Sequence, residues 1–135
     1  MKLTNKQYEQ FINNRLDIKE KQNKYKNKKV EYDGITFDSE KECNHYKLLK
    51  VLEKSGMIED LQLQVKFELQ PAFEKNGIKY RAINYIADFV YFDVSAQKKV
   101  VVDVKGSKKT ETQVFKIKKK MFIFKYKDIV FKEIF

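Results

Sequence analysis

Two apolar segments of this 135-residue chain each contain one carboxylate where an aliphatic side chain would pack better. Residues 85–92 contain Asp88, and residues 100–106 contain Asp103, which Lys105 follows two positions later. Burying a charge without a partner is costly, so each carboxylate needs a cation or hydrogen-bond donors beside it. A divalent metal ion held by oxygen ligands meets that need, and the pattern therefore indicates a metal site on a sheet.

The spacing of these residues also indicates a reaction. Asp103 and Lys105 share a face of their strand, because alternate side chains of a strand point the same way. If residues 99–105 pair with residues 85–92, Asp88 comes beside Asp103, and the two carboxylates repel each other unless a cation lies between them. Such an ion, with the Val104 carbonyl as a third oxygen ligand, would lower the pKa of bound water and stabilise charge on a phosphate oxygen. Lys105 would orient the attacking water or hold the phosphate, and the predicted reaction is hydrolysis of a phosphodiester. The alternative is an ion pair of Lys105 with Asp103 or Asp88 at the end of a sheet, without a metal.

The composition narrows the choice of metal. A single cysteine, Cys43, excludes an internal disulfide and a cysteine-rich zinc site, and a single histidine, His45, excludes a histidine-rich site. A metal would therefore have oxygen ligands, which favours Mg²⁺ or Mn²⁺.

The net charge of +10 predicts an acidic partner. Nucleic acid is the commonest such partner, and an anionic membrane surface is the competing interpretation. The sequence contains no candidate transmembrane span, and its first residues do not resemble a signal peptide. We therefore expect no membrane association and a location in the bacterial cytoplasm.

The elements that would position these residues follow from periodicity and turn residues. We expect one domain over residues 1–135, in which residues 1–29 form a helix (4–20, capped by Thr4 or Asn5) and a basic arm. The core, residues 30–135, begins with a hairpin around Asp33-Gly34 and a helix from Asp38 or Ser39 to about Ser55. Strands follow at residues 61–69, 78–92 and 99–105. A helix capped by Thr110 then runs to about residue 126, and a last strand covers residues 129–135. That helix has apolar residues on one side and lysines on the other; the apolar ones are Val114, Ile117, Met121 and Phe124.

This order predicts an α/β fold with a mixed sheet flanked by helices. Three sequential strands can pair as an antiparallel meander, and the last helix can return the final strand parallel to a neighbour.

In combination, these motifs resemble a known superfamily. Asp88, Asp103-x-Lys105 and an earlier helix with a Glu are similar to the PD-(D/E)XK nucleases, whose restriction-endonuclease-like core has the order αβββαβ. Four segments, within residues 33–42, 69–71, 85–89 and 103–106, more closely resemble a phage and prophage family, a domain of unknown function in that superfamily. The resemblance covers about residues 24–135. It departs from the superfamily pattern at Ala87, where Pro is usual, and at Asp103, where Glu is more frequent.

The resemblance implies Mg²⁺-dependent cleavage of DNA. Asp88 and Asp103 would bind the metal, Lys105 would assist the water, and Glu42 would complete the acidic cluster, although Ser39-x-x-Glu42 is also a capping box. Gln64 is a candidate polar helper. Candidate phosphate contacts are the lysines of the basic arm and those after the second aspartate, namely Lys26, Lys28, Lys29, Lys108, Lys109, Lys116, Lys119 and Lys120.

We therefore predict a small metal-dependent deoxyribonuclease acting in phage DNA metabolism. A structure-selective target such as a branched junction fits best, because the chain has no signature of base readout. Resolvase-like enzymes often act as dimers, so a homodimer is a further expectation. The alternatives are a catalytically inactive DNA-binding module of the same fold, and a structural or assembly protein whose charge serves RNA or an acidic protein.

Overall fold

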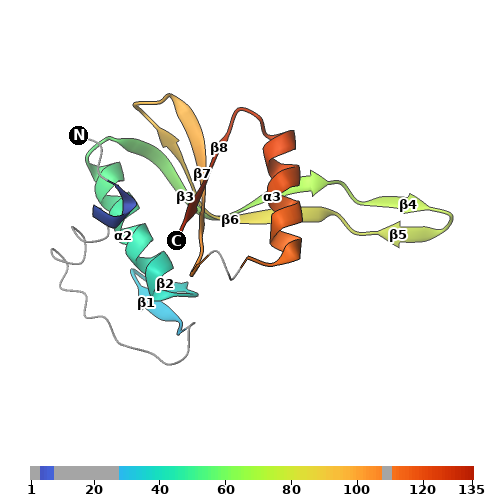
Figure 1. Ribbon diagram of the computed structural model, residues 1–135, viewed down its shortest axis with the longest axis horizontal. Helices are drawn as coiled ribbons and strands as arrows, with labels where there is room; N and C mark the ends of the chain where they lie inside the picture. Colours follow the sequence, from blue (N-terminus) through green and yellow to red (C-terminus); the bar gives the residue numbers. More distant parts are fainter. Residues whose placement is uncertain (1–3, 8–27, 108–110) are drawn as a thin grey trace. The chain divides into compact units, whose positions relative to one another are not determined.

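A computed structural model describes residues 4–7, 28–107 and 111–135 of the chain. The chain divides into two compact units, Met1–Ile58 and Glu59–Phe135 (Figure 1). Residues 5–7 are helical, and Thr4 caps them, because the Gln7 N–H donates to Thr4 Oγ1 at 3.2 Å. The rest of the helix predicted at 4–20, and the basic arm up to residue 27, lie outside the described residues.

In the first unit, a hairpin precedes a helix, as predicted. Strands β1 (Val30–Tyr32) and β2 (Ile35–Phe37) pair antiparallel around Asp33 and Gly34, whose φ angles are 56° and 73°. Positive φ at both central residues matches the twist of a two-residue hairpin. Helix α2 (Glu40–Lys54) begins after Ser39, whose hydroxyl accepts a hydrogen bond from the Glu42 N–H at 3.1 Å.

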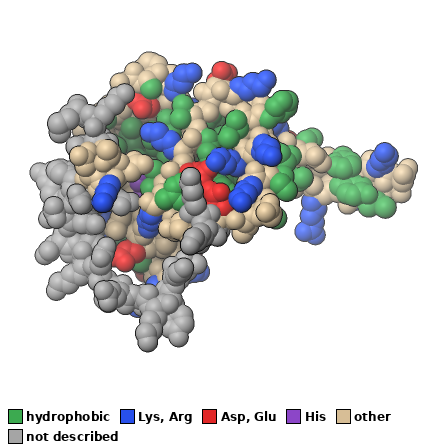
Figure 2. Space-filling view, in the orientation of Figure 1, with side chains coloured by type: hydrophobic (Ala, Val, Ile, Leu, Met, Phe, Trp, Pro, Cys, Tyr) green, Lys and Arg blue, Asp and Glu red, His purple; other side chains and the backbone are tan. Residues whose placement is uncertain are grey.

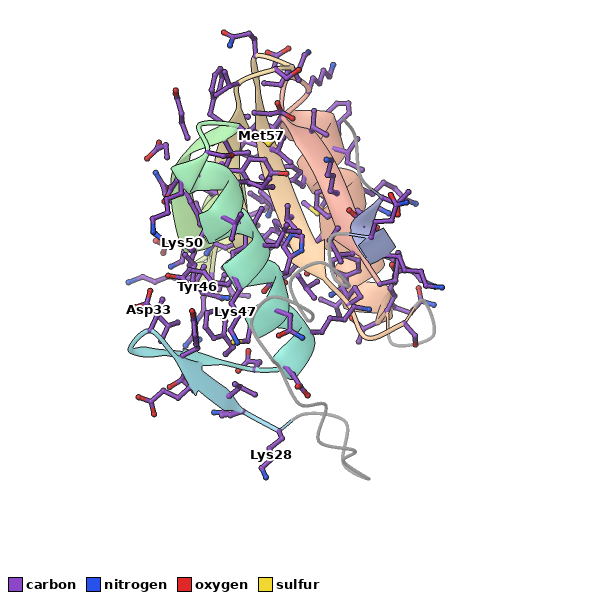
Figure 3. The ribbon with its side chains drawn as sticks, turned by 90° about the vertical axis from the view of Figure 1, so that its left-hand side faces the viewer. Lys28, Asp33, Tyr46, Lys47, Lys50 and Met57 are labelled. Carbon is purple, nitrogen blue, oxygen red and sulfur yellow. The ribbon has the colours of Figure 1, made fainter. Side chains whose placement is uncertain are left out.

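A buried tyrosine fastens the hairpin turn to the helix. The Tyr46 hydroxyl of α2 donates to Asp33 Oδ2 at 2.9 Å, and both residues are labelled in Figure 3. The Tyr46 ring also lies 5.1 Å from the Phe37 ring. Burial and the Asp33 carboxylate raise the pKa of Tyr46 to about 12, so the hydroxyl keeps its proton at neutral pH. The turn and the helix therefore form one packed element.

The second unit is built on a four-stranded mixed sheet. Its strands are β3 (Ile58–Gln70), β6 (Ile83–Asp93), β7 (Lys98–Val104) and β8 (Val130–Ile134), in the order β3-β6-β7-β8. β6 and β7 pair antiparallel, whereas β7 and β8 pair parallel. Helix α3 (Gln113–Lys125) makes the crossover between β7 and β8. The predicted α/β class and mixed sheet are therefore confirmed.

One predicted strand is divided in two. Residues 78–92 were expected to form one strand with an irregular start near Asn84, whereas the structure has two strands, β5 (Ile78–Tyr80) and β6, with a break at Arg81 and Ala82. β5 pairs antiparallel with β4 (Phe73–Lys75) across a turn at Asn76 and Gly77, both with positive φ. In Figure 1 this β4–β5 hairpin projects beyond the ends of β3 and β6, away from α3.

Helix α3 packs on the sheet mainly through a different side from the one identified in the sequence, of which Met121 packs, partly buried, against the core. Phe115 and Phe122 are its buried residues, and they join a core cluster with side chains of β3, β6 and β7. Val114, Ile117 and Phe124 are exposed. The N-cap also differs from the prediction, because Thr112 accepts from the Phe115 N–H at 3.0 Å, whereas Thr110 lies outside the described residues.

Candidate active site

The two aspartates of the predicted site lie on neighbouring antiparallel strands. The β6–β7 register pairs Phe89 with Val102, and one further step brings Asp88 opposite Asp103. Asp88 Oδ2 accepts a hydrogen bond from the Val104 N–H at 2.7 Å, which confirms that the strands are close there. The arrangement expected from the sequence, two carboxylates side by side on one sheet, is therefore present.

Lys105 is held beside these carboxylates. Its Nζ lies 3.2 Å from Asp103 Oδ2 and 3.6 Å from the centroid of the Phe115 ring. Its backbone N–H donates to the Ile134 carbonyl of β8 at 2.7 Å. The ammonium group is therefore positioned by a carboxylate, by an aromatic face of α3 and by the last strand of the sheet.

Asp103 is in an environment that disfavours its charge. The side chain is 5% exposed, and Oδ2 makes no aligned hydrogen bond within the described part of the chain, although Lys105 is near. Burial, and next the charge of Asp88, raise the pKa of Asp103 from 3.8 to about 7, and Lys105 opposes that rise. A second cation beside Asp88 and Asp103 would offset the repulsion between the two carboxylates and stabilise the charged form of Asp103.

The buried hydroxyl of Tyr85 lies at the same site. It too makes no well-aligned hydrogen bond among residues with described positions, although it interacts with the Asp103 carboxylate. Burial, and next the charge of Asp103, raise the pKa of Tyr85. The site therefore buries a carboxylate oxygen and a hydroxyl that no well-aligned hydrogen bond satisfies.

The donor set fits a hard divalent cation with few protein ligands. Asp88 and Asp103 supply carboxylate oxygens, and the observation that favours an ion is that the buried Oδ2 of Asp103 makes no aligned hydrogen bond, although Lys105 Nζ lies 3.2 Å from it. No group of three or more His, Cys, Asp or Glu in the described ranges could hold a metal. Mg²⁺ keeps several waters and is often bound by one or two carboxylates, so this pair is sufficient for it.

Gln64 of β3 reaches the Asp88 carboxylate. Its Nε2 lies 3.5 Å from Asp88 Oδ1, at the long end of hydrogen bonding. Gln64 has a φ of 51°, which is uncommon for a residue other than glycine. The predicted helper is thus brought to Asp88 by an irregular point in β3.

Glu133 was missed by the sequence reasoning. It is the register partner of Asp103 in the parallel β7–β8 pair, and it forms an ion pair with Lys119 of α3. Burial raises its pKa, but its hydrogen bonds with Glu111 and Lys119 together lower it by more. Glu133 also lines an open groove of about 580 Å³ formed with Glu111, Lys116, Lys119, Ile123, Phe131 and Phe135.

The remaining predicted residues are distributed over both units. Glu42 is buried in the first turn of α2, where its backbone N–H donates to the Ser39 hydroxyl, so the Ser39 half of the predicted capping box is confirmed. Four of the predicted phosphate contacts are exposed and one is engaged by Glu133. The exposed ones are Lys28, Lys29, Lys116 and Lys120, and the engaged one is Lys119. Lys26, Lys108 and Lys109 lie outside the described residues.

The chain is an α/β protein whose mixed sheet brings two aspartates and a lysine together. A family model described as "Protein of unknown function (DUF1064)" matches residues 22–134. The chain therefore belongs to this family. No curated protein and no solved structure matches it. Within the described ranges, no helix is long and apolar enough to cross a membrane.

Proposed function

We propose that this protein is a metal-dependent DNA endonuclease. The observation that carries the proposal is the pair of carboxylates of Asp88 and Asp103 on adjacent strands, with Lys105 Nζ 3.2 Å from Asp103 Oδ2. Hydrolysis forms a bond between a water oxygen and phosphorus and breaks one P–O ester bond. Bound Mg²⁺ or Mn²⁺ would supply a water of lowered pKa and charge stabilisation at phosphorus.

The protein's own residues orient the components of this reaction. Asp88 and Asp103 would hold the cation, and the Val104 N–H and Gln64 fix the direction of the Asp88 carboxylate. Lys105 would orient the attacking water or hold the scissile phosphate, since its ammonium group is already positioned at the carboxylates.

The restriction-endonuclease-like topology and membership of the PD-(D/E)XK superfamily are part of this proposal. Apart from the short β4–β5 hairpin, the order of α2, β3, β6, β7, α3 and β8 agrees with the αβββαβ core, and the D-x-K motif spans the end of β7, with Lys105 just beyond the strand. The charge of +10 and the exposed lysines favour binding through phosphates. A structure-selective DNA target therefore fits better than a sequence-specific one.

A DNA-binding module without catalysis is the second candidate. It is favoured by one observation, the ion pair of Lys105 with Asp103, which partly balances the buried charge without any metal. Such a module would bind DNA in EDTA and would cleave nothing with any divalent ion.

A nicking assay distinguishes the two functions. Supercoiled and branched DNA are incubated with Mg²⁺ or Mn²⁺ and the wild type, Asp103→Ala or the control Asp128→Ala, whose side chain is exposed in the turn before β8. We expect cleavage by the wild type and the control only. Equal cleavage by Asp103→Ala would refute the site, and absence of cleavage by every protein would favour the binding module.

A further inference from the structure

The β4–β5 hairpin is exposed along its whole length and has an apolar face. Every residue from 73 to 81 is exposed, and the large apolar ones are Phe73 (44%), Ile78 (56%) and Tyr80 (45%). The register pairs Phe73 with Tyr80 and Lys75 with Ile78, so these four side chains share one face. Figure 2 shows hydrophobic and basic side chains together on this projecting hairpin, at the right of the view.

The two aromatic rings of this face are prearranged. Phe73 and Tyr80 stack with their centroids 4.8 Å apart and an interplanar angle of 11°. Neither belongs to the core cluster under α3. A two-stranded hairpin is at best marginally stable alone in water, so an uncovered apolar face on one indicates a surface used for binding.

The net positive charge of the hairpin favours a negatively charged partner. Residues 73–81 contain three basic side chains and one acidic side chain, namely Lys75, Lys79, Arg81 and Glu74. Glu74 is paired in register with Lys79 on the other face, which leaves Lys75 beside the aromatic pair. A second copy of this chain would bring the same positive charge and be repelled, whereas a polyanion with flat apolar groups would be attracted.

We propose that the β4–β5 hairpin binds unpaired bases of DNA by stacking them against Phe73 and Tyr80. Base stacking on aromatic side chains beside basic residues is the usual way in which proteins bind single strands. This inference rests on the proposed function for its choice of DNA, and it deepens that function by naming the substrate class. The class is DNA with a single-stranded tail, gap or branch.

The hairpin would set the distance between the unpaired bases and the cleavage site. β5 leads into β6, and Tyr80 precedes Asp88 by eight residues. At about 3.3 Å per strand residue, the aromatic pair lies at most about 26 Å from Asp88 along the strand. That length corresponds to roughly seven or eight nucleotide steps of about 3.4 Å each.

The test is a binding measurement in EDTA, so that it does not depend on cleavage. The probe is a duplex with a single-stranded tail containing 2-aminopurine, whose fluorescence falls when the base stacks, and a blunt duplex is the comparison DNA. The double variant Phe73→Leu/Tyr80→Leu keeps apolar side chains but removes the rings, and Phe124→Leu, 75% exposed on α3, is the matched control.

We expect the wild type and Phe124→Leu to bind the tailed DNA more tightly than the blunt duplex and to quench the probe. The double variant should bind tailed DNA at least about 10-fold more weakly, without quenching, and blunt duplex as the wild type does. A second variant, Lys75→Gln, keeps both rings and should weaken tailed-DNA binding while quenching persists at saturation.

Equal binding of tailed DNA by the double variant and the wild type would overturn the inference, as would absence of DNA binding by the wild type. A dimer that disappears in the double variant with base binding intact would also overturn it, because a second copy would then cover the face. Binding as expected without cleavage by any divalent ion would refute the nuclease alone. Cleavage with unchanged binding by the double variant would refute the hairpin's role alone.

Discussion

The carboxylate of Asp88 accepts a hydrogen bond from the backbone N–H of Val104 at 2.7 Å, one residue beyond Asp103. A side chain of β6 is thereby bound to the backbone of β7 at the point where the D-x-K motif begins. The orientation of the Asp88 carboxylate is therefore set by main-chain geometry, and on β7 only a proline at position 104 would remove the donor itself. The second carboxylate, Asp103, has no such backbone donor within the described part of the chain. We therefore expect the protonation of Asp103, rather than that of Asp88, to control how stability changes with pH.

The metal-free protein should lose stability as the pH rises from about 4 to about 7. The pKa of Asp103 is raised in the folded state from 3.8 to about 7, so the folded chain holds a proton that the unfolded chain releases. The free energy of unfolding is then highest below the unfolded pKa and falls until the folded pKa is passed. The full loss is at most about 4 kcal/mol, measured by urea unfolding in EDTA across that range.

Asp103→Asn is the matched variant for this pH dependence. It should flatten the profile and be more stable than the wild type at pH 8 in EDTA, by about 2 kcal/mol. Mg²⁺ should stabilise the wild type at pH 8 and leave the variant unchanged, since the repelling charge is absent from it. Equal stabilisation of both proteins by Mg²⁺ would contradict a metal site at Asp103.

Lys105→Met should have the opposite effect on stability. Methionine keeps an apolar chain against Phe115 but removes the charge that lowers the pKa of Asp103. We expect the free energy of unfolding to fall by about 1–2 kcal/mol at pH 8 and by less at pH 4, where Asp103 is protonated. Cleavage should fall by about 10²–10⁴-fold. Lys66→Met, on the exposed part of β3, is the control and should change neither quantity.

Phe122→Ala should destabilise the second unit severely. Phe122 is fully buried, with ring centroids 5.1 Å from Phe67 and 4.9 Å from Tyr126. Removing it should cost about 3–5 kcal/mol in urea unfolding. Phe124→Ala, two residues later on the same helix, should cost under about 0.5 kcal/mol because its ring is exposed. Similar losses of stability for the two variants would contradict the packing of α3.

The affinity for DNA should fall steeply with salt. A variant without one of the phosphate-binding lysines should have a slope of log K against log salt that is smaller by about 0.9. Lys116→Ala and Lys120→Ala, both at exposed positions, should each have this effect. Lys119→Ala should change the slope by less, because Glu133 already neutralises that side chain. A slope unchanged by the first two variants would show that α3 does not bind the phosphates.

The β1–β2 and β4–β5 hairpins show that a turn signal predicts a hairpin only when the residues on both sides of it alternate between apolar and polar. Asp33-Gly34 lies between two short alternating runs, and its hairpin was expected and is present. Asn76-Gly77 has the same chemistry and positive φ angles, but the residues before it follow Pro71 and do not alternate clearly. The second hairpin was therefore not predicted: β5 was placed in the strand expected at residues 78–92, and β4 and the turn lay outside the predicted strands, although the turn signal was equally strong.

Helix α3 shows why periodicity alone was insufficient. It has apolar residues at helical spacing on two sides, one containing Phe115 and Phe122 and the other Val114, Ile117 and Phe124. The sequence pattern does not say which side meets the sheet. The side with Phe115 and Phe122 faces the sheet, because burying these two rings among other aromatic rings removes more apolar surface from water than burying the other side would.

The candidate site was only partly accessible to sequence reasoning. Asp88 and Asp103 lie on strands joined by a short turn, so their pairing follows from local register. Glu133 comes beside Asp103 through a parallel pair that α3 separates in sequence. Parallel register across a crossover leaves no local pattern, and only the fold places that glutamate at Asp103.

The parallel pairing of β7 with β8 also determines when the site can form. The Lys105 N–H is bound to the Ile134 carbonyl at 2.7 Å, and β8 is the last strand in chain order. During synthesis, residues through 134 must therefore leave the ribosome before this hydrogen bond exists. A nascent chain that already contains both aspartates and the lysine would still lack the backbone support of Lys105, so the complete site should form only after translation has passed β8.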